Sequence, residues 1–314
     1  MKTFNVITMA CALLLAPAPA APAEPGGKST APVKARQLTF DTPRAAADAL
    51  IAATADYDIP ALKAILGPGS EDLVETEDPV QDRNQGAAFA ALARAKSELV
   101  TDAKNASRAT LVIGDEDWPS PIPIVRKDGK WSFDAKAGRK EILNRRIGRN
   151  ELDAIEVCRA FVEAQHEYAS QRREGAMVNQ YAERVIASPG KQDGLAWRNP
   201  DGTWGGPLGE GAARAIAEGY SNRAQPFHGY YLKPLLGQGP AARLGQMDFV
   251  VNGVMIGGFA LVAAPADYRV TGVKTFLVSH DGVVYEQDLG SKTLERFRAM
   301  ERFNPDKGWT PVRD

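Results

Sequence analysis

Apolar residues recur at helical spacing in two stretches of the chain. The first follows Asp41 and Thr42, either of which suits an N-cap, and Pro43, which suits a first helical position. Its stripe comprises Ala46, Ala47, Leu50, Ile51 and Thr54. The second predicts a helix over about 150–172, with a stripe of Leu152, Ile155, Cys158, Phe161, Val162 and Tyr168. Further helices are predicted over about 59–66, 82–98, 137–147, 175–187, 211–218 and 291–302.

Runs rich in β-forming residues, separated by turn residues, predict strands in each half. In the first half they cover about 108–113, 121–126 and 130–133; in the second, 229–236, 247–251, 254–263, 272–279 and 283–289. Asn252-Gly253 is the strongest hairpin signal in the chain. Lys127-Asp128-Gly129 and His280-Asp281-Gly282 predict two more hairpins.

Helices followed by antiparallel strands, twice over, predict an α+β fold in two domains. We expect a first α+β domain over 38–136, a basic linker helix over 137–149 and a second α+β domain over 150–314. Each domain is expected to pack its helices on an antiparallel sheet.

The beginning of the chain has the three parts of a secretory signal peptide. Lys2 precedes a short apolar run, and small residues lead to Ala23, after which we expect cleavage; Ala20 is the alternative. Residues 24–37 are predicted to form a disordered linker, because they lack aromatic residues and apolar bulk. No later stretch is long and apolar enough for a membrane-spanning helix, so we expect a soluble periplasmic protein, or one exported further.

The net charge and the number of cysteines bear on which partners and which cysteine chemistry the mature chain can have. Cleavage removes only Lys2 from the 38 basic residues and none of the 39 acidic ones, leaving a formal net charge of −2. This charge gives no indication of nucleic acid or an anionic membrane as a partner. Cleavage also removes Cys11 and leaves Cys158 alone, which excludes an internal disulfide. Cys158 is expected to pack as a small hydrophobe; a reactive or intermolecular thiol is the alternative.

No motif in the chain indicates catalysis. His166 follows Glu163 at di-iron spacing without a second copy, and we expect it to be solvated or locally bonded. Ser279-His280-Asp281 is expected to be a turn rather than a triad, because triad members converge from distant segments. Asp115, Glu116 and Asp117 lack the spacing of a calcium loop. We therefore predict no cofactor and no metal, leave enzyme activity uncertain, and favour its absence.

The densest charge feature is a basic cluster at the predicted domain junction, formed by Arg139, Lys140, Arg145, Arg146 and Arg149. Arginine makes bidentate contacts with carboxylates, and the acidic stretch 71–82 offers them. We expect an interdomain ion-pair contact here, with an anion or partner site as the alternative. Its candidate residues are Arg145, Arg146 and Arg149.

Seven segments between residues 38 and 312 carry a resemblance to an uncharacterised bacterial exported family, domain of unknown function 2950. They are Ile65–Ser70, Gly114–Pro119, Ile142–Glu151, His228–Tyr231, Val251–Gly253, Gly257–Leu261 and His280–Tyr285. The resemblance implies export and a two-part organisation, and it brings no assigned activity.

Each half also resembles a known fold. Residues 40–135, with Tyr57–Pro60 and Gly129–Trp131, look like the cone-shaped fold of ketosteroid isomerases and polyketide cyclases. Residues 150–288 are similar to the globular part of a type II secretion pseudopilin, through 150–170 and 259–285. A whole domain stands where pseudopilins carry an apolar helix, which implies a soluble relative that does not assemble into a pilus.

These observations favour a non-catalytic binding protein or an accessory of the envelope or a secretion system. The alternative is a small-molecule binder or enzyme that uses a pocket in the first domain. An enzyme should place Asp, His or Tyr inside the cone, whereas an accessory should expose an apolar surface.

The signal peptide gives the first testable prediction. In the native host, the mature chain should begin at Glu24, and Ala20→Phe with Ala23→Phe should retain the uncleaved precursor, because signal peptidase requires small residues. Intact-mass measurement of fractionated cells checks both forms. A wild-type chain that keeps residues 1–23 would contradict the prediction.

Overall fold

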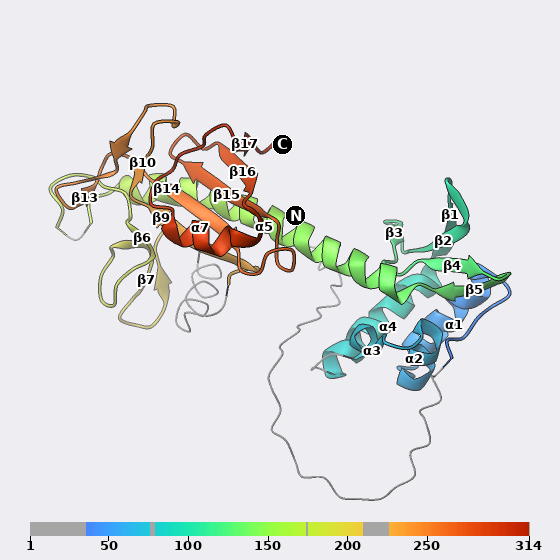
Figure 1. The fold of residues 1–314 in the computed structure, drawn as a ribbon. Helices are drawn as coiled ribbons and strands as arrows, with labels where there is room; N and C mark the ends of the chain where they lie inside the picture. Colours follow the sequence, from blue (N-terminus) through green and yellow to red (C-terminus); the bar gives the residue numbers. More distant parts are fainter. Residues whose placement is uncertain (1–35, 76–78, 174, 210–225, 314) are drawn as a thin grey trace, which may run out of the picture. The chain divides into compact units, whose positions relative to one another are not determined.

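A computed structural model describes residues 36–75, 79–173, 175–209 and 226–313. The chain has a mixed α+β fold and divides into two compact units at Ile142/Leu143 (Figure 1). The predicted signal peptide (1–23), most of the predicted linker (24–37) and the predicted helix over 211–218 lie outside the described residues. None of the described helices is long and apolar enough to cross a membrane.

Unit 1 begins with helices whose ends are set by local chemistry. Thr42 Oγ1 accepts a hydrogen bond from Ala45 N and caps α1 (Pro43–Ala55). Asp58 Oδ1 accepts one from Ala61 N and caps α2 (Ile59–Leu66). The short α3 (Glu71–Val74) and the longer α4 (Pro79–Ala95) follow.

The sheet of unit 1 is antiparallel and carries the order β1-β2-β4-β5, with β3 paired to β2. Its strands are β1 (Ser97–Asp102), β2 (Asn105–Ile113), β3 (Trp118–Pro119), β4 (Ile124–Lys127) and β5 (Lys130–Phe133). Helices and sheet share one apolar core, which includes Leu50, Ile65, Leu111, Ile124 and Phe133.

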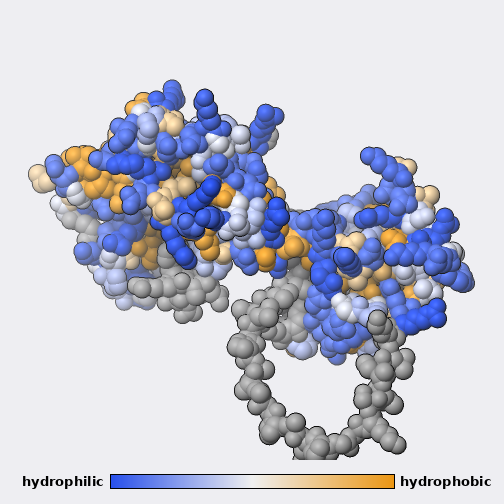
Figure 2. All heavy atoms as spheres, viewed as in Figure 1, coloured by the Kyte–Doolittle hydropathy of each residue, from blue (hydrophilic) through white to orange (hydrophobic). Residues whose placement is uncertain are grey.

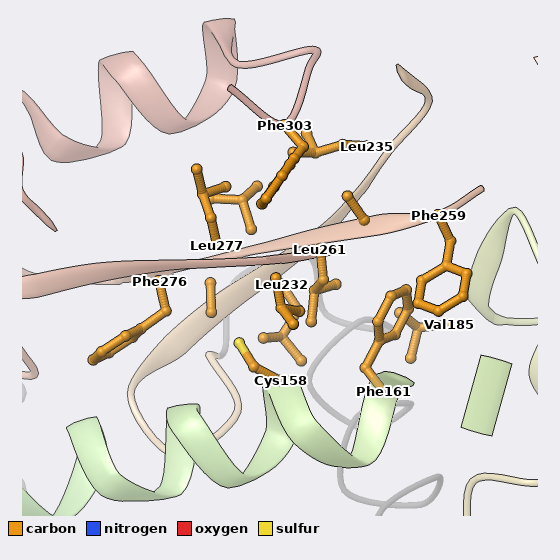
Figure 3. Packing of buried hydrophobic residues seen from close by; sticks show 14 of the residues in the cluster. Cys158, Phe161, Val185, Leu232, Leu235, Phe259, Leu261, Phe276, Leu277 and Phe303 are labelled. Atoms are coloured by element: carbon orange, nitrogen blue, oxygen red, sulfur yellow. The ribbon is translucent and has the colours of Figure 1, made fainter. Parts of the chain in front are cut away.

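Unit 2 is built on a five-stranded antiparallel sheet of order β17-β16-β15-β14-β9. These strands are β9 (Tyr230–Leu235), β14 (Ala260–Pro265), β15 (Lys274–Ser279), β16 (Val284–Asp288) and β17 (Thr310–Pro311). The later turns of α5 (Ala135–Ala169) cover one face: Cys158 and Phe161 point toward the side of the sheet that carries Leu261 and Phe276 (Figure 3).

The C-terminal segment covers the other face of this sheet. Leu235, Leu277 and Phe303 pack together on the side opposite α5 (Figure 3). After the 3₁₀ helix η1 (Gly290–Lys292) comes α7 (Thr293–Ala299), whose Phe297 ring stacks on Tyr231. Lys233 Nζ donates hydrogen bonds to the carbonyls of Phe297 and Arg298, at 2.5 and 3.1 Å, and so caps the helix end.

Short strands complete unit 2. They are β6 (Arg184–Ile186), β7 (Gly194–Arg198), β8 (Trp204–Gly205), β10 (Gly237–Gln238), β11 (Met247–Asp248), β12 (Val250–Val251) and β13 (Val254–Met255). The predicted Asn252-Gly253 hairpin is confirmed: Val251 pairs with Val254, and both turn residues have positive φ, 51° and 77°. The predicted hairpins at Asp128-Gly129 and at 280–282 are also confirmed.

Two helix predictions were wrong. The predicted helices over 137–147 and 150–172 are parts of one continuous helix, α5, which ends at Ala169, because Gly148 between them costs only about 1 kcal/mol and no proline interrupts the run. The predicted helix over 175–187 is absent from its described residues: β6 lies there and pairs in parallel with β7, which places Val185 in the core. Tertiary pairing overrides local propensity at this segment.

Three finer expectations also differ from the structure. β1 begins at Ser97, where a helix end was predicted, because the strand pairs along most of β2. The predicted strand 254–263 is split between β13 and β14, since Gly257-Gly258 intervenes with a φ of 142° at Gly258. Leu152, predicted in the buried stripe of α5, is 66% exposed.

The doubly covered sheet gives the second prediction. Leu277→Ala should lower the free energy of unfolding by about 2–5 kcal/mol, because the side chain is only 1% exposed and its removal leaves a cavity. The exposed Leu152→Ala is the control and should change it by less than about 0.5 kcal/mol. Urea denaturation followed by circular dichroism measures both, and equal effects would contradict the assignment of the core.

Candidate functional site

A cavity of about 260 Å³ in unit 2 lies at the turn between β15 and β16. It is lined by Gln238, Arg243, Leu244, Ser279, His280, Asp281 and Phe303. Gln238, Arg243 and Leu244 belong to β10 and the segment after it. Ser279, His280 and Asp281 belong to the β15–β16 turn, and Phe303 belongs to the C-terminal segment. Three regions distant in sequence therefore build the site.

Asp281 orders the turn that forms one wall. Its Oδ1 accepts hydrogen bonds from Ser279 Oγ at 3.0 Å and from Val283 N at 3.1 Å. Gly282 N donates to Ser279 O at 2.9 Å. The expectation that Asp281 bonds the backbone of its own turn is confirmed. The Ser279 hydroxyl donates its hydrogen bond to Asp281 rather than to His280. The arrangement is therefore not a Ser-His-Asp triad.

His280 lies with one ring edge in an aromatic environment. Its ring meets those of Phe249 and Phe259 edge to face, at centroid distances of 6.0 and 6.3 Å. Nδ1 is buried and has no hydrogen-bond partner among the described residues. Gly258 permits this packing, because a Cβ there would lie 2.9 Å from Nδ1. Nε2 is then the nitrogen left for the cavity.

The opposite wall is held rigidly. Gln238 is buried, and its Nε2 donates to Gly245 O at 2.7 Å. Arg302 Nη1 donates to Met247 O at 3.1 Å, and its Nη2 to Asp248 Oδ1 at 2.5 Å. These contacts fasten the C-terminal segment to β10 and β11, so that the buried Phe303 forms an apolar wall.

Two opposite charges face this cavity without pairing with each other. Within the described part of the chain, neither Arg243 nor Asp281 forms an ion pair, although both line the same cavity. Arg243 is exposed, and its neighbour Leu244 is 67% exposed. The cavity thus combines a guanidinium, a carboxylate, an imidazole and apolar carbon.

The other two histidines lie elsewhere in unit 2. His166 is exposed, and its ring packs edge-on against Phe259 at 5.4 Å. His228 Nδ1 lies 2.6 Å from Asp153 Oδ2, and its backbone has a φ of 46° in the tight turn between Phe227 and Tyr230. The sequence analysis missed this pair, because 75 residues separate its members and no local signal links them.

No group of three or more His, Cys, Asp or Glu side chains that could hold a metal occurs within the described ranges. In the acidic run 115–117, Asp117 Oδ1 accepts a hydrogen bond from Lys96 Nζ at 2.7 Å. Cys158 is fully buried, and this burial raises the pKa of its thiol to about 12. Cys158 therefore packs as a small hydrophobe, as expected from the sequence.

One arginine of the basic cluster makes the predicted carboxylate contact. Arg139 Nε donates to Asp72 Oδ2 at 2.7 Å, its Nη2 to Asp72 Oδ1 at 2.5 Å, and Nη2 also to Gly69 O. Arg139 and Asp72 both belong to unit 1, so this contact lies within one unit. The interdomain or partner role of Arg145, Arg146 and Arg149 stays a prediction.

Comparison with family models shows that the chain belongs to the family described as "Protein of unknown function (DUF2950)", which matches residues 37–312. No curated protein gives a significant match. No solved structure gives one either, so the cone-like and pseudopilin-like resemblances have no structural neighbour to support them. The site therefore has to be interpreted from its own geometry.

The Arg139–Asp72 pair gives the third prediction. The hydrogen bond from Arg139 lowers the pKa of Asp72, so the pair stabilises the fold above the unfolded-state pKa and loses this effect as pH falls through the folded-state value. Asp72→Asn should therefore cost up to about 1 kcal/mol near neutral pH, a value reduced by solvent screening, and almost nothing at an acidic pH below the lowered folded-state pKa of Asp72. Urea denaturation at both pH values measures this, with the exposed Asp56→Asn as control. A cost that does not depend on pH would contradict the ion pair.

Proposed function

We propose that this protein is an exported, non-catalytic binding protein of the bacterial envelope, and that the cavity at the β15–β16 turn is its binding site. One observation carries the proposal: Arg243 and Asp281 line one small cavity and, within the described residues, are not paired with each other. Two opposite charges that line one cavity without pairing with each other are suited to a ligand that carries complementary charges for both.

The polar groups of the cavity favour binding over catalysis. Ser279 Oγ is committed to Asp281, and His280 Nδ1 has no described partner that would orient it as a general base. A catalytic nucleophile needs a base within hydrogen-bond reach, and the base needs an orienting group. The described residues of the cavity supply charged and apolar groups for binding, but they do not form a connected set of nucleophile, base and orienting group.

The alternative, an enzyme that uses a pocket in the first domain, has less support. Unit 1 has a cavity of about 190 Å³ beside Gln37, whose Nε2 donates to the carbonyls of Ile65, Leu66 and Phe133. The buried polar side chains described in unit 1 are Ser70 and Ser120, and residues 1–142 contain no histidine. Asp134 lines this cavity, but its Oδ1 accepts a hydrogen bond from Ala137 N in the first turn of α5, and neither His nor Tyr is among the lining residues.

Exposed apolar side chains in unit 2 support an accessory role. Those at least 38% exposed include Leu236, Leu244, Val251, Ile256 and Val283. Figure 2 shows hydrophobic surface around β13, which lies between Val251 and Ile256. Export is supported by the signal-peptide pattern of residues 1–23.

Site-specific photo-cross-linking in the native host tests this proposal and is the fourth prediction. A photoreactive phenylalanine derivative in place of Leu244, at the rim of the cavity, should form an adduct that mass spectrometry identifies. The same substitution at Leu152, which is 66% exposed against 67% for Leu244, is the matched control.

Adducts should form at position 244 but not at 152, and Arg243→Glu should reduce their yield at least about tenfold, because one lost charge contact is worth roughly 1.4 kcal/mol or more. Equal yields at both positions, or an adduct that Arg243→Glu leaves unchanged, would count against this binding site.

A further inference from the structure

We infer that the ligand of this cavity is a free α-amino acid with an apolar side chain, bound as its zwitterion. This inference rests on the proposed function and names the chemical class of its ligand. Four features of the site carry it: an arginine, a carboxylate, an imidazole donor and an apolar wall, all around about 260 Å³.

Arg243 provides the contact for the ligand carboxylate. A guanidinium presents a planar fork of N–H donors that matches the two oxygens of a carboxylate. Arg243 is exposed, and within the described residues its side chain has no hydrogen bond or ion pair that would occupy this fork.

Asp281 provides the contact for the ligand ammonium. Its Oδ1 is held by Ser279 Oγ and Val283 N, which fixes the orientation of the carboxylate. Among the described residues no donor contacts Oδ2, so this oxygen can accept a hydrogen bond from a bound ammonium group. The hydrogen bonds to Oδ1 thus hold the turn in place, and the negative charge of the Asp281 carboxylate can still interact with the ammonium group of a ligand.

His280 adds a hydrogen-bond donor. Nδ1 is buried and has no acceptor for a proton among the described residues, so Nε2 is the ring nitrogen available to donate to a ligand. Nε2–H can then donate to the second oxygen of the ligand carboxylate. The packing of Phe249, Phe259 and Gly258 around the ring holds that donor in place.

The charge pattern selects a zwitterion over a simple ion. A plain anion on Arg243 would also face the carboxylate of Asp281, and a plain cation on Asp281 would face the guanidinium. Only a ligand with both charges satisfies both residues. Leu244 and the 2% exposed Phe303 supply the apolar surface for its side chain.

The size of the cavity limits the ligand. Pockets for drug-sized ligands occupy roughly 300–1,000 Å³, so a cavity of about 260 Å³ fits a single amino acid rather than a folded peptide.

Isothermal titration calorimetry with the full mature chain is the test and the fifth prediction. The probes are leucine, methionine and phenylalanine, together with N-acetylleucine, which lacks the ammonium, and leucinamide, which lacks the carboxylate. At least one free amino acid should bind, and both blocked derivatives of leucine should bind at least about tenfold more weakly than leucine.

Three variants test the residues. Arg243→Gln should weaken amino-acid binding at least about tenfold, and so should Asp281→Asn, whose amide oxygen can still accept from Val283 N and keep the turn. Arg296→Gln, an exposed arginine on α7, should have no effect. Circular dichroism of each variant verifies its fold.

Two outcomes would overturn the inference: no binding by any of the free amino acids, or N-acetylleucine binding as tightly as leucine, which would mark an anion site. The proposed function is judged separately by the adduct at position 244. If that adduct forms while the amino acids fail, the ligand class is wrong and the binding site stands; if both fail, the proposed function fails as well.

Discussion

Burial of one sheet on both faces is the constraint on which unit 2 depends. Every residue of β14 is buried, because α5 covers one face of the sheet and the C-terminal segment with α7 covers the other (Figure 3). A strand buried on both faces has no polar side, which explains the uninterrupted apolar run Ala260–Pro265. Burying apolar surface at roughly 25 cal/mol per Å² makes this double cover the main source of stability. Cys158 tolerates the environment because its thiol stays protonated there.

The candidate site is a consequence of the same double cover. For the C-terminal segment to lie on the sheet, Phe303 has to pack beside Leu277 and Leu235, and Arg302 has to reach the carbonyl of Met247. The wall that results stands opposite the β15–β16 turn and encloses the cavity. The site is thus formed where the covered sheet ends, and its charges come from turns rather than from the core. Turns can vary in sequence without disturbing the sheet, which suits them to ligand recognition.

The sequence predicted parts of the site whose chemistry is local. Asp281 was expected to bond its own turn, and it does, because an aspartate side chain reaches the backbone two residues ahead. The sequence did not indicate that Arg243, Gln238 and Phe303 would join this turn, since Arg243 and Ser279 are 36 positions apart and no periodicity links them. The Asp153–His228 and Arg139–Asp72 contacts were missed or only partly anticipated for the same reason.

By itself, the sequence determined the α+β class, the starts of α1 and α2 and the hairpin turns, because caps, stripes and positive-φ residues act over a few positions. Membership of the family also follows from the sequence alone. Only the tertiary structure decided that residues 135–169 form one helix, that β6 replaces a predicted helix, and that β1 extends the first sheet. It also decided which charged residues meet around the cavity. The continuous helix forms because Gly148, between the two predicted helices, costs only about 1 kcal/mol. The strands β1 and β6 and the cavity depend on contacts with other segments of the chain, whose energies outweigh local propensities of about 1 kcal/mol or less per residue.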